Sequence, residues 1–353
     1  MRIKVWLDSQ TSKQSTLLGF LAKELNRHGF ETIITCRDYE FTAEAFKVLG
    51  LEPEVVGHYS EGDAWDKVLA DVHRIKAFID LLRHRKPDIL VSYPNPAAAR
   101  VAFGVGIKYL ALTDSPHSSL PSRLSLPLAD EVIFSEAIPT KEIKKYVTDS
   151  LTRLSTFRGV DELVWILRRR PIRKYVEGLG LKPGKYVVVR PHEEKATYYR
   201  GLNVAVDIES LIKQLSYEGY LSVILPRYRS HELLVRKLVK EGLKVIALHK
   251  GFDGLSLSFY AKAVITGGAT MAREAALLMT PGITYFPLEL HVNEYVAMKG
   301  YPLHKVSTTQ EILDVIRNAE GKHPPYEEVR EKLLRDFEDP LPRIISAIKG
   351  LAS

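Results

Sequence analysis

The chain has 353 residues, more than a single domain usually holds, which favours two domains of similar size. Hydrophobic residues make up 45% and charged residues 26% of it, a balance that is ordinary for a globular protein and excludes extensive disorder. The lone cysteine, Cys36, excludes an intrachain disulfide, and a net charge of +7 suits an anionic ligand. The sequence shows neither a signal peptide nor an apolar run long enough to span a membrane, so we expect a cytoplasmic protein.

Strands and helices alternate through the first half of the sequence. Apolar runs predict six strands, at 3–8, 30–36, 53–57, 88–93, 107–112 and 131–135. Helical periodicity predicts intervening helices at 13–28, 41–49, 64–85 and 96–103. In the helix at 64–85, the apolar spacing predicts an inward-facing stripe made of Trp65, Val68, Leu69, Val72, Ile75, Ile79 and Leu82. This alternation predicts a parallel sheet with right-handed helical crossovers.

A change of composition near residue 160 separates the two halves. A basic segment at 166–175, ILRRRPIRKY, leads into GLGLKPGK, which has the glycine and proline content of a linker. Further strands are then predicted at 185–191, 221–226, 243–248, 263–266 and 283–286, with helices between them and in the tail. The sequence therefore predicts two Rossmann-like, doubly wound α/β domains, at 1–160 and 185–353, joined by a linker at 161–184.

The second domain contains a strand, a glycine pair and a helix in succession, in the stretch AVITGGATMAREAALLM at 263–279. In open α/β sheets ligands bind beyond the carboxyl ends of the strands, and the unpaired N–H groups of a helix start attract anions. Gly267 and Gly268 would let a phosphate approach the backbone, and Thr270 and Glu274 share the helix face that points back toward the turn. We therefore expect a diphosphate at the glycines and a ribose at Glu274, although a sharp strand-to-helix turn by itself also favours glycine.

Basic residues follow strands in both domains. Arg190 and Arg227 each come after a strand of the second domain, where a guanidinium would meet the diphosphate; surface ion pairs are the alternative. Lys13 and Gln14 open the first helix and are expected at the corresponding edge of the first sheet. The second domain is thus expected to bind a diphosphate, which leaves the first domain for a second substrate.

Three residues of the first domain are candidates for a catalytic base, all expected in loops at the mouth of a cleft. Asp114 is the first choice and His117 the second, because both belong to the loop TDSPHSS; Asp8, near the end of the first strand, is the third. The first strand lacks the glycines of G-x-G-x-x-G, no G-x-x-x-x-G-K-[ST] occurs, and no ligand spacing suits zinc. Neither a cofactor nor a metal is therefore expected.

Four stretches of the sequence resemble a largely archaeal family named for domain of unknown function 354: VWLDSQTSKQ, AARVAFGVGIKYLALTDSPHSSLPSRLSLPLAD, YVVVRPHEEKATYY and VITGGATMAREAALLMTP. More broadly, the pattern is similar to the GT-B group of nucleotide-sugar enzymes, which implies two Rossmann-like domains facing across a cleft, with the donor bound mainly by the carboxyl-terminal domain. The glycine turn and Glu274 resemble the diphosphate and ribose contacts of the glycosyltransferase that makes the peptidoglycan lipid precursor, and of UDP-N-acetylglucosamine 2-epimerases. The epimerase pattern has acidic residues where this chain has Ala269, Thr270 and Met271, which argues against a direct epimerase assignment.

These features predict a metal-independent glycosyltransferase that uses a nucleoside-diphosphate sugar. The alternatives are an epimerase or hydrolase of the same donor, and a nucleotide-sugar binding protein without catalytic activity. The acceptor is undefined; a lipid-linked one would suit the basic residues at 168–174 with Trp165 and Ile166, and would bring the protein to the inner face of the membrane. The sequence shows no helix-turn-helix, zinc-finger or RNP motif, so no nucleic acid partner is expected.

Overall fold

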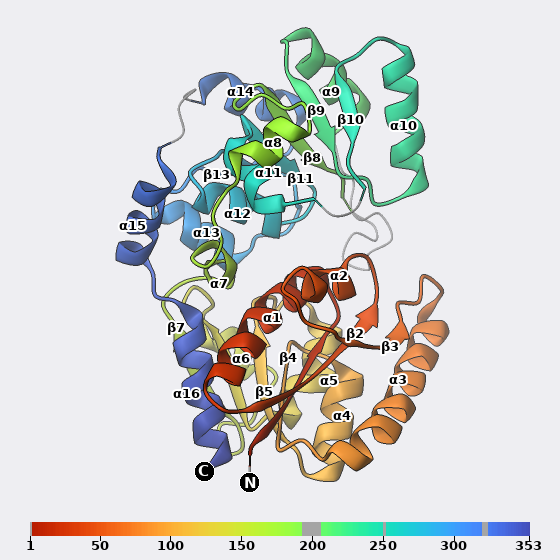
Figure 1. Ribbon diagram of the computed structural model, residues 1–353, viewed down its shortest axis with the longest axis vertical. Coiled ribbons are helices and arrows are strands. Elements are labelled where there is room, and N and C mark those ends of the chain that lie inside the picture. The colour runs from red at the N-terminus through yellow and green to blue at the C-terminus, as the bar shows by residue number, and fades with distance from the viewer. Residues whose placement is uncertain (1, 193–205, 250–251, 320–323) are drawn as a thin grey trace. The chain divides into compact units, whose positions relative to one another are not determined.

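The chain folds into two compact units. The first comprises Met1–Trp165 and Phe337–Ser353, and the second comprises Ile166–Asp336. Each unit contains one parallel sheet with helices between successive strands, so the predicted class of two Rossmann-like α/β units is confirmed. The computed structural model describes residues 2–192, 206–249, 252–319 and 324–353 (Figure 1).

Seven parallel strands form the sheet of the first unit. They are β1 (Lys4–Ser9), β2 (Glu31–Asp38), β3 (Glu54–His58), β4 (Ile89–Ser92), β5 (Lys108–Thr113), β6 (Glu131–Ser135) and β7 (Arg153–Phe157). Their order in the sheet is β3-β2-β1-β4-β5-β6-β7, and Val5, Trp6 and Leu7 of the central β1 are fully buried. Because the chain runs outward from β1 to β3 and then returns to β4, the loops after β1 and β4 adjoin at the carboxyl edge of the sheet.

Helices cover both faces of this first sheet. They are α1 (Ser12–Arg27), α2 (Thr42–Lys47), α3 (Ala64–Arg85), α4 (Pro96–Val105), α5 (Ser119–Ser125), the 3₁₀ turn η1 (Leu126–Leu128), α6 (Thr140–Lys144), α7 (Leu163–Ile166) and α16 (Pro340–Ala352). The crossovers after β3 run across the sheet in the opposite direction from those after β1, so α3, α4 and α5 lie on the other face from α1 and α2. Contacts join α3 to α4 and α4 to α5, which makes these three helices one layer (Figure 1).

Helix α3 turns a different face to the sheet from the one that its apolar spacing predicts. Its buried residues are Arg74, Phe78 and Leu82. Phe78 packs edge-on against Trp6, with ring centroids 4.9 Å apart, and Arg74 enters an ion pair in the core. A buried arginine therefore sets the inward face of α3, and apolar spacing alone does not predict it. The predicted inward stripe is wrong for five residues, which are 38–83% exposed: Trp65, Val68, Leu69, Val72 and Ile79.

The last helix of the chain returns to the first unit. The side chain of Asp339 caps α16 by accepting from the N–H of Leu341, and the helix contacts α1, β4 and β5. Ile344 and Ile348 are buried in that contact layer. The unit boundary thus differs from the expected domain at 185–353, because apolar packing along α16 joins the end of the chain to the first sheet.

Six parallel strands form the sheet of the second unit. They are β8 (Tyr186–Arg190), β9 (Leu221–Ile224), β10 (Val245–Ala247), β11 (Ala263–Thr266), β12 (Gly282–Thr284) and β13 (Leu303–Lys305). The order β10-β9-β8-β11-β12-β13 reverses between β8 and β11, as it does between β1 and β4. The helices are α8 (Arg173–Gly178), α9 (Ile208–Tyr217), α10 (Arg229–Lys240), α11 (Gly254–Tyr260), α12 (Thr270–Leu277), α13 (His291–Met298), α14 (Thr309–Asn318) and α15 (Tyr326–Asp336).

Candidate functional site

A lysine surrounded by carboxylates lies at the carboxyl edge of the first sheet. Lys13, in the first turn of α1, contacts Asp114 in the loop after β5, and its Nζ lies 2.9 Å from Asp161 Oδ2 and 3.8 Å from Glu162 Oε1. These four side chains are only 1–16% exposed, so water screens their charges weakly. We call Lys13, Asp114, Asp161, Glu162 and the adjoining Tyr93 the Lys13 cluster.

The Lys13 cluster brings three carboxyl groups around one lysine. Burial raises the pKa of Asp161, and the neighbouring carboxylates of Asp114 and Glu162 raise it further, against the opposing effect of Lys13. Tyr93 donates a hydrogen bond of 2.5 Å to Asp161 Oδ2, and its own pKa is raised by burial and by Asp161, so the phenol stays a donor. A buried carboxyl group of raised pKa beside a lysine is an arrangement suited to general acid–base chemistry.

Two members of the Lys13 cluster, Asp161 and Glu162, were missed at the sequence level. They follow β7, whose sequence RLSTF contains only two apolar residues and which lies at the sheet edge. Because apolar runs predict no strand there, the sequence did not indicate that the following loop lies at the edge of the sheet. The signal that was present is the pair of adjacent carboxylates in GVDEL.

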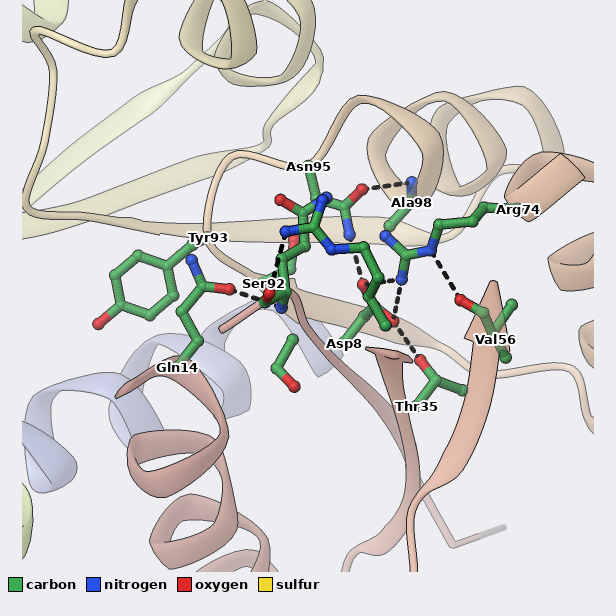
Figure 2. A network of polar contacts seen from close by, with 12 residues as sticks. Asp8, Gln14, Thr35, Val56, Arg74, Ser92, Tyr93, Asn95 and Ala98 are labelled. Carbon is green, nitrogen blue, oxygen red and sulfur yellow. Dashed lines mark hydrogen bonds and ion pairs between the residues drawn. The ribbon is translucent and has the colours of Figure 1, made fainter. Parts of the chain in front are cut away.

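Asp8 does not lie in a loop, and the prediction that placed it at a cleft mouth is wrong. It belongs to β1, is 1% exposed, and binds Arg74 Nη2 through both carboxylate oxygens, at 3.1 and 3.0 Å. Thr35 donates to it at 2.5 Å, and the side-chain amide of Asn95 donates as well (Figure 2). These donors hold Asp8 inside the core, where it joins β1, β2, α3 and α4. Its pKa is raised by burial, against the charge of Arg74.

The remaining candidates of the first unit occupy the loops near these groups. Gln14 accepts a 2.8 Å hydrogen bond from the N–H of Gln10, so its side chain closes the turn between β1 and α1 (Figure 2). His117 follows Asp114 by three residues in the loop before α5 and is exposed. Asp114 therefore remains the candidate base that the fold brings against Lys13.

In the second unit, Gly267 is required by close packing. Its N–H donates to the carbonyl of Arg190, with an N···O distance of 3.1 Å, which joins the turns after β11 and β8. A Cβ at Gly267 would lie 2.2 Å from the Cβ of His192 and 2.5 Å from its Cα, closer than real contacts allow. Close packing against His192 therefore explains why residue 267 is a glycine.

Gly268 differs from its neighbour. A Cβ there would approach Thr266 Oγ1 at 3.6 Å, an ordinary contact, and the backbone does not need a positive φ. Its N–H donates to Thr266 Oγ1 at 2.9 Å, and its carbonyl accepts from Thr284 at 2.8 Å, so the turn is fixed by both flanking strands. Among the described residues nothing else comes within contact of that Cβ position. Within the described ranges, a side chain at residue 268 would therefore meet only ordinary contacts.

Helix α12 begins directly after this turn without a side-chain cap. Its N-cap, Ala269, offers no side-chain hydrogen bond, and the first turn contains no acidic residue. The N–H groups of that turn precede the point where intrahelical bonding begins, and together with the helix dipole they favour an anion.

The two arginines lie at the same edge of the sheet. Arg190 ends β8, is 8% exposed, and pairs in register with Thr266 of β11. Arg227 donates from Nε to the carbonyl of Pro191 at 3.0 Å, which holds it beside the end of β8. Glu274 lies one turn inside α12, with Oε1 3.8 Å from the place of a Cβ on Gly254, and so faces the start of α11. Arg190 and Arg227 thus lie near the end of β8, and Glu274 lies near the start of α11.

The residues proposed for membrane contact are engaged within the protein. Trp165 and Ile166 are 4% and 0% exposed, so the expectation that they accompany the basic segment onto a lipid surface is wrong. Arg169 and Arg170 of that segment pair with Asp253 and Glu327, both at N···O distances below 3 Å. Within the described ranges, no helix combines the length and apolar character needed to cross a bilayer, and no His, Cys, Asp and Glu side chains are grouped to hold a metal.

The fold, with its two switch points, is of the GT-B class. The UDP-GlcNAc 2-epimerase of Neisseria meningitidis, solved bound to UDP-GlcNAc, aligns with a TM-score of 0.72 at 17% identity, covering 99% of this chain and 100% of that one. The Methanocaldococcus jannaschii UDP-GlcNAc 2-epimerase, in complex with UDP-GlcNAc and UDP, gives 0.67 at 13% identity, covering 98% and 100%. Glycyrrhiza uralensis UGT73P12 gives 0.60 at 12% identity, covering 100% and 96%.

The chain belongs to the family described as "Protein of unknown function (DUF354)", whose model matches residues 3–350. Uncharacterized protein MJ0665 of Methanocaldococcus jannaschii is 24% identical over 330 residues, which are 91% of this chain and 93% of that protein. The resemblance noted in the sequence is thereby confirmed, both for the family and for the fold.

Proposed function

We propose that the protein is an enzyme that acts on a nucleoside-diphosphate sugar, with the donor held by the second unit. The observation that carries this proposal is the start of α12 without a side-chain cap, which follows Gly268 directly and lies at the same edge of the sheet as Arg190. Helix N–H groups and a guanidinium together suit a diphosphate. Proteins of similar fold solved with UDP-GlcNAc support this ligand class.

Glycosyl transfer is the first candidate reaction, with Asp114 as the base. An acceptor hydroxyl would lose its proton to Asp114 as its oxygen bonds to the anomeric carbon of the sugar. The bond from that carbon to the diphosphate breaks, and the nucleoside diphosphate leaves with the electron pair. Lys13 fixes the position of the Asp114 carboxylate, and the start of α12 with Arg190 meets the charge that grows on the diphosphate.

Epimerisation or hydrolysis of the same donor is the second candidate, and the Lys13 cluster favours it. Asp161, whose pKa is raised chiefly by burial, and Asp114 both contact Lys13, so two carboxyl groups adjoin. Such a pair serves proton transfer at carbon, or activation of water, without an acceptor sugar. Product analysis separates the two reactions, since only transfer requires an added acceptor.

A thermal-shift panel tests the donor site first. UDP, GDP, ADP, CDP and dTDP, each with its common sugar conjugates, are added to the wild type, to Gly268→Asp and to Gly178→Asp. The control glycine has open space around its Cβ position and lies in α8, away from the switch. We expect one base to stabilise the wild type and Gly178→Asp by about 2.7 kcal/mol at 100 times its dissociation constant, and Gly268→Asp to show no gain. Equal gains in all three proteins would refute a phosphate site at Gly268.

Turnover is tested separately with Asp114→Asn. We expect a loss of about 10²–10⁴-fold in kcat, with nucleotide affinity unchanged within a few-fold, because the base acts in the first unit. Retained turnover would remove Asp114 from this role. Tight nucleotide-sugar binding by a wild type that forms no product from any acceptor, or from water, would identify a binding protein instead.

A further inference from the structure

The layer formed by α3, α4 and α5 carries an unusual concentration of exposed apolar side chains. Nine of them, all 38–83% exposed, lie on these three helices: Trp65, Val68, Leu69, Val72, Ile79, Phe103, Val105, Leu120 and Leu124. They are half of the large apolar side chains that are exposed in the described part of the chain. We call these nine side chains the apolar layer.

The nine side chains of the apolar layer are spread over three adjoining helices. At on the order of 100 Å² for each side chain, they present on the order of 900 Å² in all. A standard protein interface buries about 800 Å² on each partner. The apolar layer is therefore large enough for one stable protein partner.

Helix α3 supplies the longest part of the apolar layer and has the pattern of a helix-pairing seam. Its 22 residues span about 33 Å, and Trp65, Val68, Val72 and Ile79 recur at spacings of three, four and seven. Seven-residue spacing keeps these side chains on one side of the helix, where they can interlock with an equal stripe on another helix.

The charges of α3 indicate the orientation of its partner. The helix starts with Asp63 and Asp66 and ends with Arg83, His84 and Arg85. A second copy of α3 lying antiparallel would place each acidic start opposite a basic end, and would oppose the two helix dipoles. A two-fold axis creates both contacts at once, because the same surface then serves on each side.

We propose that the apolar layer, centred on α3, is the interface of a two-fold symmetric homodimer in which the two α3 helices lie antiparallel. This assignment is independent of the reaction that the protein catalyses. Each chain covers the apolar side chains of the other, and the acidic and basic ends of α3 set the orientation.

Sedimentation velocity of the full chain over a concentration series tests the dimer. We expect the wild type to sediment as a dimer, and Val72→Glu to raise the dissociation constant more than about tenfold, because a carboxylate would be buried in the middle of the seam of each copy. Val239→Glu is the matched control: both valines are on helices and are 51% and 52% exposed, but Val239 lies on α10 of the other unit. A wild type that stays monomeric, or a dimer that survives Val72→Glu, would overturn the proposal.

Charge reversal tests the antiparallel orientation. Arg83→Glu would bring an acidic side chain against the acidic start of the partner helix, so we expect the dissociation constant to rise about fivefold at low salt, and less at high salt. Arg343→Glu, on α16, makes the same change of charge on another exposed helix of the same unit and should have no effect. Equal effects of both variants would overturn the antiparallel arrangement.

Discussion

The two sheets have switch points of the same topology, but they present different chemistry there. At the carboxyl edge of the first sheet the clustered groups are side chains, with Lys13 among the carboxylates of Asp114, Asp161 and Glu162. At β8 and β11 the edge offers mostly backbone, with the turn at Gly268 and the start of α12, which has no side-chain cap. The strand order alone therefore fixes where a ligand can bind, and a few loop residues decide whether the edge offers acid–base groups or an anion site.

The buried ion pair behind the first switch point should give the largest effect on stability. Arg74→Met leaves the carboxylate of Asp8 in the core without its cation, so we expect the free energy of unfolding to fall by about 3–5 kcal/mol. Urea denaturation followed by circular dichroism measures this loss. Arg236→Met, at an exposed position of α10, should change stability by less than about 0.5 kcal/mol. Similar values for the two variants would show that the Asp8–Arg74 pair does not hold the first unit together.

Replacement by alanine should lower stability at only one of the two neighbouring glycines of the second switch point. Gly267→Ala forces a Cβ against the backbone of His192, and we expect it to cost about 1–3 kcal/mol. Gly268→Ala meets only ordinary contacts and should change the free energy of unfolding by less than about 0.5 kcal/mol. Chemical denaturation of both variants checks the contrast. If Gly268→Ala proved the more damaging of the two, both glycines would be structural and the anion site would lose its support.

The order of strands and most helices could be predicted from the sequence, because buried parallel strands are continuous apolar runs. The inward face of α3 could not be predicted. Arg74 is buried in an ion pair with Asp8, which lies 66 residues earlier in the chain, and no local pattern indicates that pairing. The same limit applies to Asp8, which reads as a polar strand end but is enclosed by donors from β2, α3 and the start of α4.

The candidate site was predictable where a loop follows an apolar strand. Lys13 and Asp114 were found in this way, and the fold brings them into contact although 101 residues separate them. Asp161 and Glu162 were not predicted as site residues, because the strand before them is an edge strand with polar residues. The different roles of Gly267 and Gly268 depend on where His192 lies in space, which their sequence does not reveal.

The Lys13 cluster should make stability depend on pH. The pKa of Asp161 is raised above the value of about 3.9 expected in the unfolded chain, chiefly by burial. Between these two pKa values the folded protein holds a proton that the unfolded chain has released. The free energy of unfolding therefore falls as the pH rises through this window, by up to about 1.4 kcal/mol per pH unit, and levels off above the folded pKa.

Asp161→Asn removes this dependence. The difference in the free energy of unfolding between the variant and the wild type should therefore change with pH from about 4 upward and then become constant. Urea denaturation at a series of pH values measures it. Asp149→Asn, whose side chain is 64% exposed, is the control and should follow the wild-type curve. Parallel curves for Asp161→Asn and the wild type would mean that Asp161 is ionised over the whole range.

Two threonines beside the second switch point separate an effect on folding from an effect on binding. Thr284 donates to the carbonyl of Gly268 and is 1% exposed, so Thr284→Ala should lower the free energy of unfolding by about 1–3 kcal/mol and disturb the turn. Thr270, at the first position of α12, forms no side-chain hydrogen bond with the described residues, so Thr270→Ala should leave stability unchanged. If its hydroxyl contacts a bound diphosphate, calorimetric titration should show nucleotide affinity reduced about 2- to 12-fold, the equivalent of about 0.5–1.5 kcal/mol. Unchanged affinity would restrict the anion site to the backbone of α12 and the arginines, because the hydroxyl would then have no part in either folding or binding.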